Sequence, residues 1–393
     1  MNKFFLNLGS QPLANNYLTK FKKSQIKYNL KLFFNTKTKM VSISKRIPSE
    51  KMFTNNYPYR SSLSKTMRDS FYKLSLEIKK RFNPEIILEI GSNDGALIKN
   101  FDNQVAIGVE PCANLSLITK RMGFNTYNKY WNFDLANKIK SKFKNIDVIY
   151  SANTLTHISN LNEVFKSISF TLSDKGILII EDPSLLECLK KNSYDQFYNE
   201  HIYLFSALSV KNLLKKFNLE IFDIKSLETH GGSIRYYIKK ISNKKLTISN
   251  NVKKQIVKEK KYGLHKYSTY KKFSKNVQMS KIKLLNMLNG LKDKKQKVIG
   301  YGSTAKAVTI LNFCNINEDL ICNFVDTTPE KINRYMPGKN IKILKYNNKI
   351  LKKYYHVFLG AWNFKKEIMQ KEKLFLKKGG KFITHVPSPH FIK

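Results

Sequence analysis

Ile86-Ile87-Leu88-Glu89-Ile90-Gly91-Ser92-Asn93-Asp94-Gly95 is the stretch of this 393-residue chain that decides its fold. An apolar run that ends in glycine is typical of a buried strand entering a turn, and Ala96-Leu97-Ile98 then restart an apolar helical pattern. A second apolar run, at 105–109, ends on Glu110. An acid at the end of the second strand can accept hydrogen bonds from both hydroxyls of a ribose. The pattern therefore indicates a nucleoside-binding βαβ unit.

The spacing of the glycines narrows the kind of nucleoside ligand. Gly91 and Gly95 let the backbone approach a ligand closely, and Asn93-Asp94 lie between them. A dinucleotide-binding loop instead reads G-x-G-x-x-G and holds a pyrophosphate. The spacing seen here suits S-adenosylmethionine, which has no pyrophosphate. We therefore expect S-adenosylmethionine to be the cofactor.

The net charge of +43 raises the question of a nucleic-acid partner. Only seven of the 71 basic residues are arginine, although arginine is the residue that reads bases and phosphates bidentately. The lysines are spread evenly, a pattern typical of compositional drift in an AT-rich genome. The charge therefore predicts a solvated surface and no nucleic-acid partner, and it remains compatible with anionic ligands such as sugar nucleotides.

Targeting signals and cysteine usage indicate a cytoplasmic location. No stretch of about 18 uncharged apolar residues is present, so neither a transmembrane helix nor a membrane partner is expected. The segment Met1–Asn7 is too short in apolar residues for a signal peptide. The four cysteines form no C-x-x-C pair, which predicts reduced thiols and no zinc knuckle.

Hydrophobic periodicity divides the chain into four parts and places it in the α/β class. Residues 1–75 are irregular, with loop-like segments such as Gly9-Ser10-Gln11-Pro12 and one short strand pair. Residues 76–245 alternate strands with helices, which predicts a doubly wound sheet. Residues 246–295 show helical spacing, and residues 296–393 form a second α/β unit. The predicted strands lie at 28–34 and 40–43, then at 86–90, 105–109, 146–150, 176–181, 220–225 and 233–238, and finally at 297–301, 321–325, 356–360 and 381–386.

Two polar segments carry candidate chemistry. His157 follows the strand predicted at 146–150, at the sheet edge where ligands bind in open α/β sheets. A structural histidine that caps a helix would give the same pattern. The segment Tyr194–His201 is dense in titratable groups. A histidine can accept a proton near neutral pH, and a tyrosine can hydrogen-bond a developing enolate. Polar surface loops look similar, so both interpretations stay open.

Two glycine-containing turns complete the set of motifs. Thr229-His230-Gly231-Gly232-Ser233 permits close backbone approach before a strand, although a plain tight turn would look the same. Gly300-Tyr301-Gly302-Ser303-Thr304-Ala305-Lys306 fits G-x-G-x-x-A, and Asp326 ends the next strand, as in a dinucleotide fingerprint. A helix N-terminus with Lys306 also makes an anion site, which a sugar-nucleotide diphosphate would satisfy equally well.

Taken together and in chain order, these segments resemble the sugar C-methyltransferases that act on nucleotide-linked 4-keto-deoxysugars. The resemblance covers nearly the whole chain, and its specificity lies in the ordered set rather than in any single motif. The matching segments are Leu8–Asn15, Tyr57–Ser62, Glu89–Gly95, Val109–Pro111, Ala152–His157, Tyr198–His201, Thr229–Arg235, Tyr301–Lys306, Val325–Asp326, Pro337–Gly338 and Trp362–Phe364.

The resemblance implies a small N-terminal zinc-binding domain, a class I methyltransferase (Rossmann-like) domain, and a C-terminal Rossmann-like domain that helps to hold the sugar nucleotide. It implies a monomer that methylates carbon, most simply C3, after a base removes the proton α to the C4 ketone. His201 matches this base, with Tyr198 and Glu200 close by, and His157 and Tyr59 face the sugar. The implied cofactor-binding residues are Glu89, Gly91, Asn93, Asp94, Gly95, Glu110 and Asn153. The implied substrate-binding residues are Tyr57, His230, Gly231, Ser233, Arg235, Tyr301, Gly302, Lys306 and Asn363.

The chain departs from the family pattern at two places. The first C-x-x-C knuckle of the family would precede Leu8 and is absent, and the second falls where Asn35 and Thr38 replace its cysteines. A structural zinc site needs four thiolate or imidazole ligands, so we expect no zinc and an N-terminal region held by packing alone. Asn199 also stands where the family often has histidine, and because His201 is kept we expect activity to survive.

Three other functions fit part of the sequence. Gly300–Ala305 with Asp326 would suit an NAD-dependent oxidoreductase of sugar nucleotides, which saturable NADH binding would support. The basic composition would suit a nucleic-acid-binding protein, which a steep salt dependence of DNA binding would support. The lost zinc ligands would suit a decayed methyltransferase that keeps only a binding role.

Overall fold

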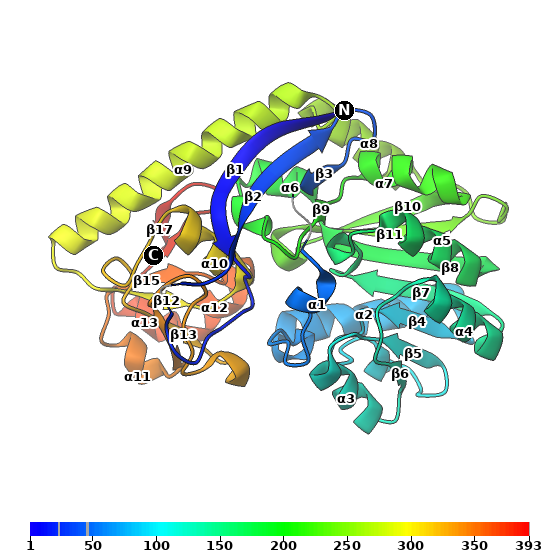
Figure 1. The fold of residues 1–393 in the computed structure, drawn as a ribbon, viewed down its shortest axis with the longest axis horizontal. Helices are drawn as coiled ribbons and strands as arrows, with labels where there is room; N and C mark the ends of the chain where they lie inside the picture. The colour runs from blue at the N-terminus through cyan, green and yellow to red at the C-terminus, as the bar shows by residue number, and fades with distance from the viewer. Residues whose placement is uncertain (23, 45–46, 393) are drawn as a thin grey trace.

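The computed structural model describes residues 1–22, 24–44 and 47–392, and it contains three β-sheets. Figure 1 shows two α/β units on opposite sides of the view, with strands β1 and β2 arching between them and helix α9 running along the top left. In the part of the chain so described, no helix combines the length and the apolar character that a membrane crossing requires.

The first α/β unit is built on a seven-stranded sheet of order β10-β11-β8-β7-β4-β5-β6. β4 pairs in parallel with both β5 and β7, so the order of the strands reverses at β4, and ligands bind at such a switch point. β11 runs antiparallel to both of its neighbours. The strands are β4 (Ile87–Ile90), β5 (Ala106–Val109), β6 (Asn125–Tyr127), β7 (Ile146–Ala152), β8 (Leu172–Pro183), β10 (Leu219–Leu227) and β11 (Ser233–Lys240). The predicted doubly wound sheet is confirmed.

Helices cover both faces of this sheet, which is why all four residues of β4 and of β5 are buried. Helix α2 shows how the sequence sets such a helix: it begins after Ser64, whose side chain accepts a hydrogen bond from the amide of Met67, and ends at Asn83 in the left-handed conformation. The main helices of the unit are α2 (Lys65–Phe82), α3 (Ala113–Arg121), α4 (Phe133–Phe143), α5 (Leu161–Thr171) and α7 (Ala207–Leu214), with the short helices α1 (Ser49–Met52) and α6 (Leu185–Lys190).

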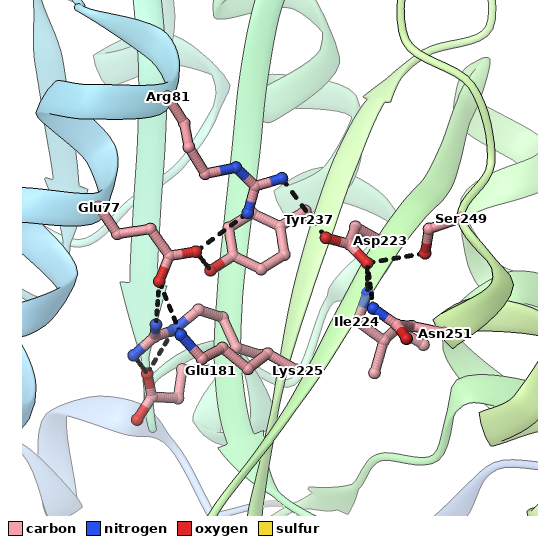
Figure 2. A network of polar contacts seen from close by, with 10 residues as sticks. Glu77, Arg81, Glu181, Asp223, Ile224, Lys225, Tyr237, Ser249 and Asn251 are labelled. Atoms are coloured by element: carbon pink, nitrogen blue, oxygen red, sulfur yellow. Dashed lines mark hydrogen bonds and ion pairs between the residues drawn. The ribbon is translucent and has the colours of Figure 1, made fainter.

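A network of charges fixes α2 to the sheet (Figure 2). The Arg235 guanidinium donates to Oε2 of Glu181 from Nε and Nη2, at 3.0 and 2.9 Å, and its Nη1 lies 3.5 Å from Glu77 on α2. Burial raises the pKa of Glu77, but hydrogen bonds from Tyr237, Lys225 and Arg81 bring it down to about 2. The helix and the sheet therefore share charges that stay ionised over the physiological range of pH.

The second α/β unit repeats the architecture in a six-stranded sheet of order β14-β13-β12-β15-β16-β17. β12 pairs in parallel with β13 and with β15, which makes a second switch point, and this confirms the predicted C-terminal Rossmann-like unit. The strands are β12 (Val298–Tyr301), β13 (Asn323–Asp326), β14 (Lys342–Lys345), β15 (His356–Leu359), β16 (Lys381–Thr384) and β17 (His390–Ile392). The helices are α10 (Ala305–Phe313), α11 (Asn348–Leu351), α12 (Lys365–Lys371) and α13 (Lys373–Lys377).

The third sheet has the order β1-β2-β3-β9 and begins at the N-terminus. Its strands are β1 (Asn2–Pro12), β2 (Lys27–Asn35), β3 (Val41–Ile43) and β9 (Tyr203–Leu204), so the last strand comes from the middle of the chain. The interpretation of Gly9–Pro12 as a loop was wrong, because these residues lie in β1. The register of β1 shifts between Asn7 and Ser10, where Gly9 has a φ of 75°, and this irregularity breaks the alternation that would have indicated a strand.

The predicted helical segment between the two units forms α8 (Asn250–Tyr262) and α9 (Tyr267–Asp293). α9 buries one stripe of side chains at helical spacing, including Tyr270, Val277, Leu284 and Leu288. β1 packs against both α9 and α10, so the N-terminal sheet contacts the linker and the C-terminal unit. The domain boundaries at 75/76, 245/246 and 295/296 remain predictions.

Candidate active site

One cavity of about 670 Å³ joins the two switch points. The predicted site residues that line it are Tyr57, Tyr59, Glu89, Gly91, Asn93, Glu110, Asn153, His157, Tyr198, His201, His230, Tyr301, Gly302, Lys306 and Asn363. The predicted site residues outside its lining are Asp94, Gly95, Glu200, Gly231, Ser233 and Arg235. The structure thus brings most of the candidates to one place, although they come from every region of the chain.

The glycine turn after β4 is shaped by close contacts. Gly91 has a φ of 78°, and a Cβ atom there would lie 2.1 Å from Oγ1 of Thr154, so a side chain does not fit. Glu110 accepts hydrogen bonds from the amides of Asn93, at 2.9 Å, and Cys112, at 2.8 Å. Burial raises the pKa of this carboxyl, and the two amides oppose the change. The turn therefore presents an open backbone next to a carboxyl group of fixed orientation.

Glu89 offers the cavity an unused acceptor. Its side chain is buried, and Oε2 has no hydrogen-bond partner among residues 1–22, 24–44 and 47–392. Burial, with the nearby charges of Glu110 and Asp94, raises the pKa of Glu89 well above 4.5. An orphaned carboxyl oxygen on a cavity wall fits a ligand that brings a hydrogen-bond donor or a positive charge. S-adenosylmethionine carries an ammonium and a sulfonium, so the residues present fit this cofactor.

Asp94 supports the turn from behind instead of facing the cavity. Its carboxylate accepts hydrogen bonds from the Ser62 amide, at 3.2 Å, and the Ser62 hydroxyl, at 2.5 Å. The side chain of Asn93 donates to the carbonyl of Tyr59 at 3.2 Å. These bonds fasten the loop of Tyr57 and Tyr59 across the turn, so that both tyrosines line the cavity.

His201 is held as a neutral imidazole whose Nε2 lone pair points to the hydroxyl of Tyr198. Nδ1 lies 2.7 Å from the carbonyl oxygen of Gln196, and because a carbonyl only accepts, Nδ1 carries the proton. Nε2 therefore accepts from the hydroxyl of Tyr198 at 2.6 Å. Burial lowers the pKa of His201 well below 6.5, and the nearby His157 and Lys306 lower it further. The arrangement can remove a proton from a bound molecule.

Two more histidines face the same space. The His157 ring lies between Phe53 and His201, with centroid distances of 5.6 and 5.0 Å. Burial lowers the pKa of His157 to about 3 and that of His230, with help from Lys306, also to about 3. Nε2 of each ring lacks a hydrogen-bond partner within the described part of the chain. All three imidazoles are therefore neutral and able to bind a ligand.

Glu200 and His201 point in different directions, as expected for adjacent residues. The Glu200 carboxylate accepts from Nδ2 of Asn15, at 2.8 and 3.0 Å, and from the hydroxyl of Tyr57, at 2.7 Å. Burial raises the pKa of Glu200 to about 7, although Tyr57 and Asn15 oppose the change. Glu200 lies behind Tyr57 and acts on the cavity through that tyrosine.

In the turn after β12, the carboxylate of Asp326 has different hydrogen-bond partners from the corresponding acid of a dinucleotide-binding site. One oxygen of Asp326 accepts from the Ser303 amide, at 2.8 Å, and the Ser303 hydroxyl, at 2.6 Å, and the other accepts from the amide of Thr328 at 2.8 Å. In a dinucleotide site the corresponding acid binds the ribose hydroxyls. Here both oxygens already hold the protein's own loop, which weighs against NAD.

Lys306 lies in the first turn of α10 and is only 8% exposed. Among the described residues its ammonium forms no hydrogen bond or ion pair, and burial lowers its pKa while the charge of Asp195 opposes the change. Asp195 accepts from Nε1 of Trp362 at 2.5 Å and lies 3.2 Å from Nε2 of His385. The ammonium of Lys306 therefore faces the cavity, and the nearby carboxylate of Asp195 is held by Trp362 and His385 of the C-terminal unit.

Three residues predicted to bind substrate have structural contacts. Ser233 donates to the carbonyl of Thr229 at 3.0 Å, and Arg235 donates from Nη2 to Glu181 at 2.9 Å. A Cβ atom on Gly231 would lie 2.3 Å from the indole of Trp362. The alternation of β11 directs Arg235 into the network with α2, which the sequence of the turn does not reveal.

Sequence reasoning also missed two residues of the site. Gln196 binds Nδ1 of His201 through its carbonyl and donates from Nε2 to the carbonyl of His230 at 2.6 Å. Asp195 anchors the same segment to Trp362. Both lie inside the polar cluster that the sequence indicated, but no pattern shows where a backbone carbonyl points.

The turn that replaces the second zinc knuckle closes on itself. Oδ1 of Asn35 accepts from the amides of Lys37, at 3.0 Å, and Thr38, at 2.8 Å, and Nδ2 donates to Asn2 at 2.8 Å. Within the residues that the structure describes, no group of three or more His, Cys, Asp or Glu side chains could hold a metal ion. The expectation that the protein binds no zinc stays a prediction.

Comparison with known proteins identifies both α/β units. The family of methyltransferase domains matches residues 59–224, and the family of C-methyltransferase C-terminal domains matches residues 228–387. The chain is 27% identical over 310 residues to the C-methyltransferase NovU of Streptomyces niveus, an alignment that covers 78% of this chain and 74% of that protein.

Solved methyltransferase structures also align with part of the chain. An S-adenosylmethionine-dependent methyltransferase from Anabaena variabilis aligns with a TM-score of 0.38 and 17% identity, over 49% of this chain and 91% of that one. Another from Clostridium acetobutylicum aligns with a TM-score of 0.33 and 15% identity, over 44% and 91%. The two matched domain families and the relative from Streptomyces support an S-adenosylmethionine-dependent methyltransferase that is similar to C-methyltransferases.

Proposed function

We propose that this C-methyltransferase methylates the carbon α to the ketone, at C3, of a nucleotide-linked 4-keto-deoxysugar. The observation that carries the proposal is the position of the neutral His201 in a cavity that is lined by carboxyl groups of the methyltransferase unit and by a lysine of the C-terminal unit. Carboxyl groups of Glu89 and Glu110 lie at the methyltransferase end, which suits a cationic methyl donor. The C-terminal unit contributes the ammonium of Lys306 to the lining, a positive charge that suits the negative charge developing on a keto sugar.

The reaction begins with proton removal by His201. Its Nε2 takes the α proton, the C–H electron pair forms a C=C bond, and the carbonyl π pair moves to the oxygen to give an enolate. A C–H bond beside a ketone is acidic enough for this step if the enolate oxygen is stabilised. The hydroxyl of Tyr198 leaves Nε2 and becomes available to donate to the substrate. When bound, S-adenosylmethionine supplies the electrophilic methyl group that the enolate carbon takes up.

The other lining residues have roles in binding and orientation under this proposal. The acceptor atoms near the glycine turn hold the cofactor, and His157 and Tyr59 orient the sugar ring. Residues behind the lining hold those that touch the ligands: Glu200 holds Tyr57, and Asp94 holds the loop of Tyr59. The cofactor contacts proposed are Glu89, Gly91, Asn93, Glu110 and Asn153, and the substrate contacts proposed are Tyr57, His230, Tyr301, Gly302, Lys306 and Asn363.

The test is transfer of labelled methyl from S-adenosylmethionine to dTDP-4-keto-2,6-dideoxyglucose and related keto-sugar nucleotides, with the methylated carbon located by NMR. Absence of label in every keto sugar would refute the proposal. His201→Ala should lower kcat by about 10²–10⁴-fold, the usual contribution of a general base. Binding of S-adenosylmethionine to this variant should be unchanged, and His390→Ala, at the far edge of the second sheet, is the matched histidine control.

A further inference from the structure

We infer that Lys306 is a catalytic residue whose ammonium binds the enolate oxygen formed by His201, and that its ligand is not the diphosphate. The inference rests on the proposed function and extends it. Under this inference the ammonium of Lys306 binds the ketone oxygen of the sugar and not the phosphates of the nucleotide.

The charge of Lys306 is more available to a ligand than the charges of Lys331 and Arg60, which also line the cavity. Lys331 donates to the carbonyl of Ser303 at 2.8 Å, and Arg60 forms an ion pair with Glu330 at 2.5 Å. Both are therefore already bound within the protein. Lys306 is buried and lines the cavity, and its ammonium forms no hydrogen bond or ion pair with another residue in the described part of the chain. A buried ammonium without a partner indicates a ligand group that satisfies it.

Lys306 lies on a helix that contacts the segment holding His201. Helix α10, which carries Lys306 in its first turn, packs directly against the 3-10 helix η4 (Tyr194–Gln196). The carbonyl of Gln196 in η4 binds Nδ1 of His201. The charge of Lys306 also lowers the pKa of both His201 and His230, so it acts in the part of the cavity where these rings lie.

The proposed reaction creates a negative charge that the histidines cannot neutralise. Proton removal leaves one negative charge on a single oxygen, and the three histidines around it are neutral because burial lowers the pKa of each. The hydroxyl of Tyr198 is neutral too. A compact lysine ammonium supplies a point charge to a single oxygen, whereas a diphosphate spreads its charge over many oxygens. Lys306 is therefore the positive charge that the enolate can use.

The step balances without further reactants. The α C–H bond breaks, its proton binds Nε2 of His201, and its electron pair becomes the C=C bond while the carbonyl π pair moves to the oxygen. An N–H of Lys306 donates a hydrogen bond to this oxygen and keeps its proton. When the enolate carbon bonds to the methyl group, the sulfur–methyl bond of the donor would break with its electron pair left on sulfur, so that the thioether would be the leaving group. The C=O bond re-forms, and His201 retains the proton until solvent takes it.

The experiment measures enolisation separately from methyl transfer. The protein is incubated in D₂O with a keto-sugar nucleotide that the wild-type protein methylates, without S-adenosylmethionine, and NMR follows loss of the α proton. Lys306→Met should lower the exchange rate and kcat by about 10²–10³-fold, as removal of an oxyanion donor does. Binding of dTDP, which has no ketone, should stay within about twofold of wild type. Lys306→Arg keeps the charge and should restore part of the rate.

A pH profile adds a readout that a structural role would not move. Because the charge of Lys306 lowers the pKa of His201, Lys306→Met should move the acid limb of kcat/KM to higher pH. Lys371→Met is the matched control, since Lys371 also lines the cavity but lies over the ring of Tyr346, with Nζ 3.6 Å from the centroid. It should leave exchange unchanged. Lys306→Gln gives a second neutral variant if the methionine variant does not fold.

The outcomes separate the two proposals. Full exchange by a folded Lys306→Met or Lys306→Gln protein, with or without weaker dTDP binding, would overturn the role of Lys306 and leave the methyltransferase proposal intact. Loss of dTDP binding with normal exchange at saturation would assign Lys306 to the diphosphate instead. Failure of the wild-type protein to exchange or methylate any keto-sugar nucleotide would refute the proposed function itself.

Discussion

Replacing Glu200 with glutamine should remove a pH dependence of stability that this buried carboxyl imposes on the protein. Glu200 is 2% exposed and accepts hydrogen bonds from Asn15 and Tyr57. Burial raises its pKa from 4.5 to about 7 in the folded protein. Glutamine has nearly the same shape, keeps an acceptor oxygen for the Asn15 amide, and can donate to the Tyr57 hydroxyl, but it never ionises.

The magnitude follows from the two pKa values. Since one pKa unit corresponds to about 1.4 kcal/mol, ionised Glu200 lowers the free energy of unfolding by about 3 kcal/mol. Below pH 4.5 the carboxyl is protonated in both states and this term is absent. Between pH 4.5 and about 7 the unfolded chain ionises while the folded protein does not, so stability falls as the pH rises. Above pH 7 the loss is complete and constant.

The assay is urea unfolding of the wild-type and Glu200→Gln proteins at a series of pH values from 4 to 8. The free energy of unfolding of the variant, relative to that of wild type, should rise by about 3 kcal/mol from pH 4 to pH 8. Glu85→Gln, which removes the same charge from an exposed position, is the control. A difference between wild type and Glu200→Gln that is the same at pH 4 and pH 8 would refute the reasoning.

Three other substitutions test contacts described above. Asn35→Ala removes the acceptor for two backbone amides in the turn that replaces a zinc knuckle, so it should lower the unfolding free energy by about 1–2 kcal/mol; an unchanged urea midpoint would contradict this. Glu181→Leu removes the carboxylate that accepts two hydrogen bonds from the buried guanidinium of Arg235, so it should lower the free energy of unfolding by about 3–5 kcal/mol. Thermal unfolding would detect this loss, and an unchanged melting temperature would disprove it. Gly231→Ala places a Cβ atom 2.3 Å from Trp362 and should change tryptophan fluorescence and lower stability by about 1–3 kcal/mol; identical spectra and midpoints would count against the contact.

The sequence predicted the two central sheets because their strands carry strong local signals. β4 is an apolar run that ends in a glycine turn, and all four of its residues are buried. β1 gave no such signal, since the shifted register near Gly9 interrupts the alternation. β6 and β9 are only three and two residues long, so they are too short to show a period.

The candidate site was predictable at the level of residues but not of contacts. His201 and Lys306 both lie in motifs with recognisable chemistry, and both line the cavity. The carbonyl of Gln196 that orients His201 could not be inferred, because backbone direction depends on the tertiary fold. Arg235 was expected to bind the substrate. A strand places successive side chains on opposite faces of the sheet, and the sequence does not show which face a helix covers. In the structure Arg235 lies on the face covered by α2, where it pairs with Glu77.

The pairing of β3 with β9 has a consequence for the order of events during synthesis. The amide of Ile43 donates to the carbonyl of Ile202 at 2.9 Å, and Val41 pairs with Leu204, directly after His201. The N-terminal strands leave the ribosome first but cannot complete their sheet until residue 204 has followed them. The segment of His201 is likewise anchored only when this distant pairing closes. The imidazole of His201 is therefore fixed only after about half of the chain has been made, and we expect a truncation that removes β3 to disturb its position.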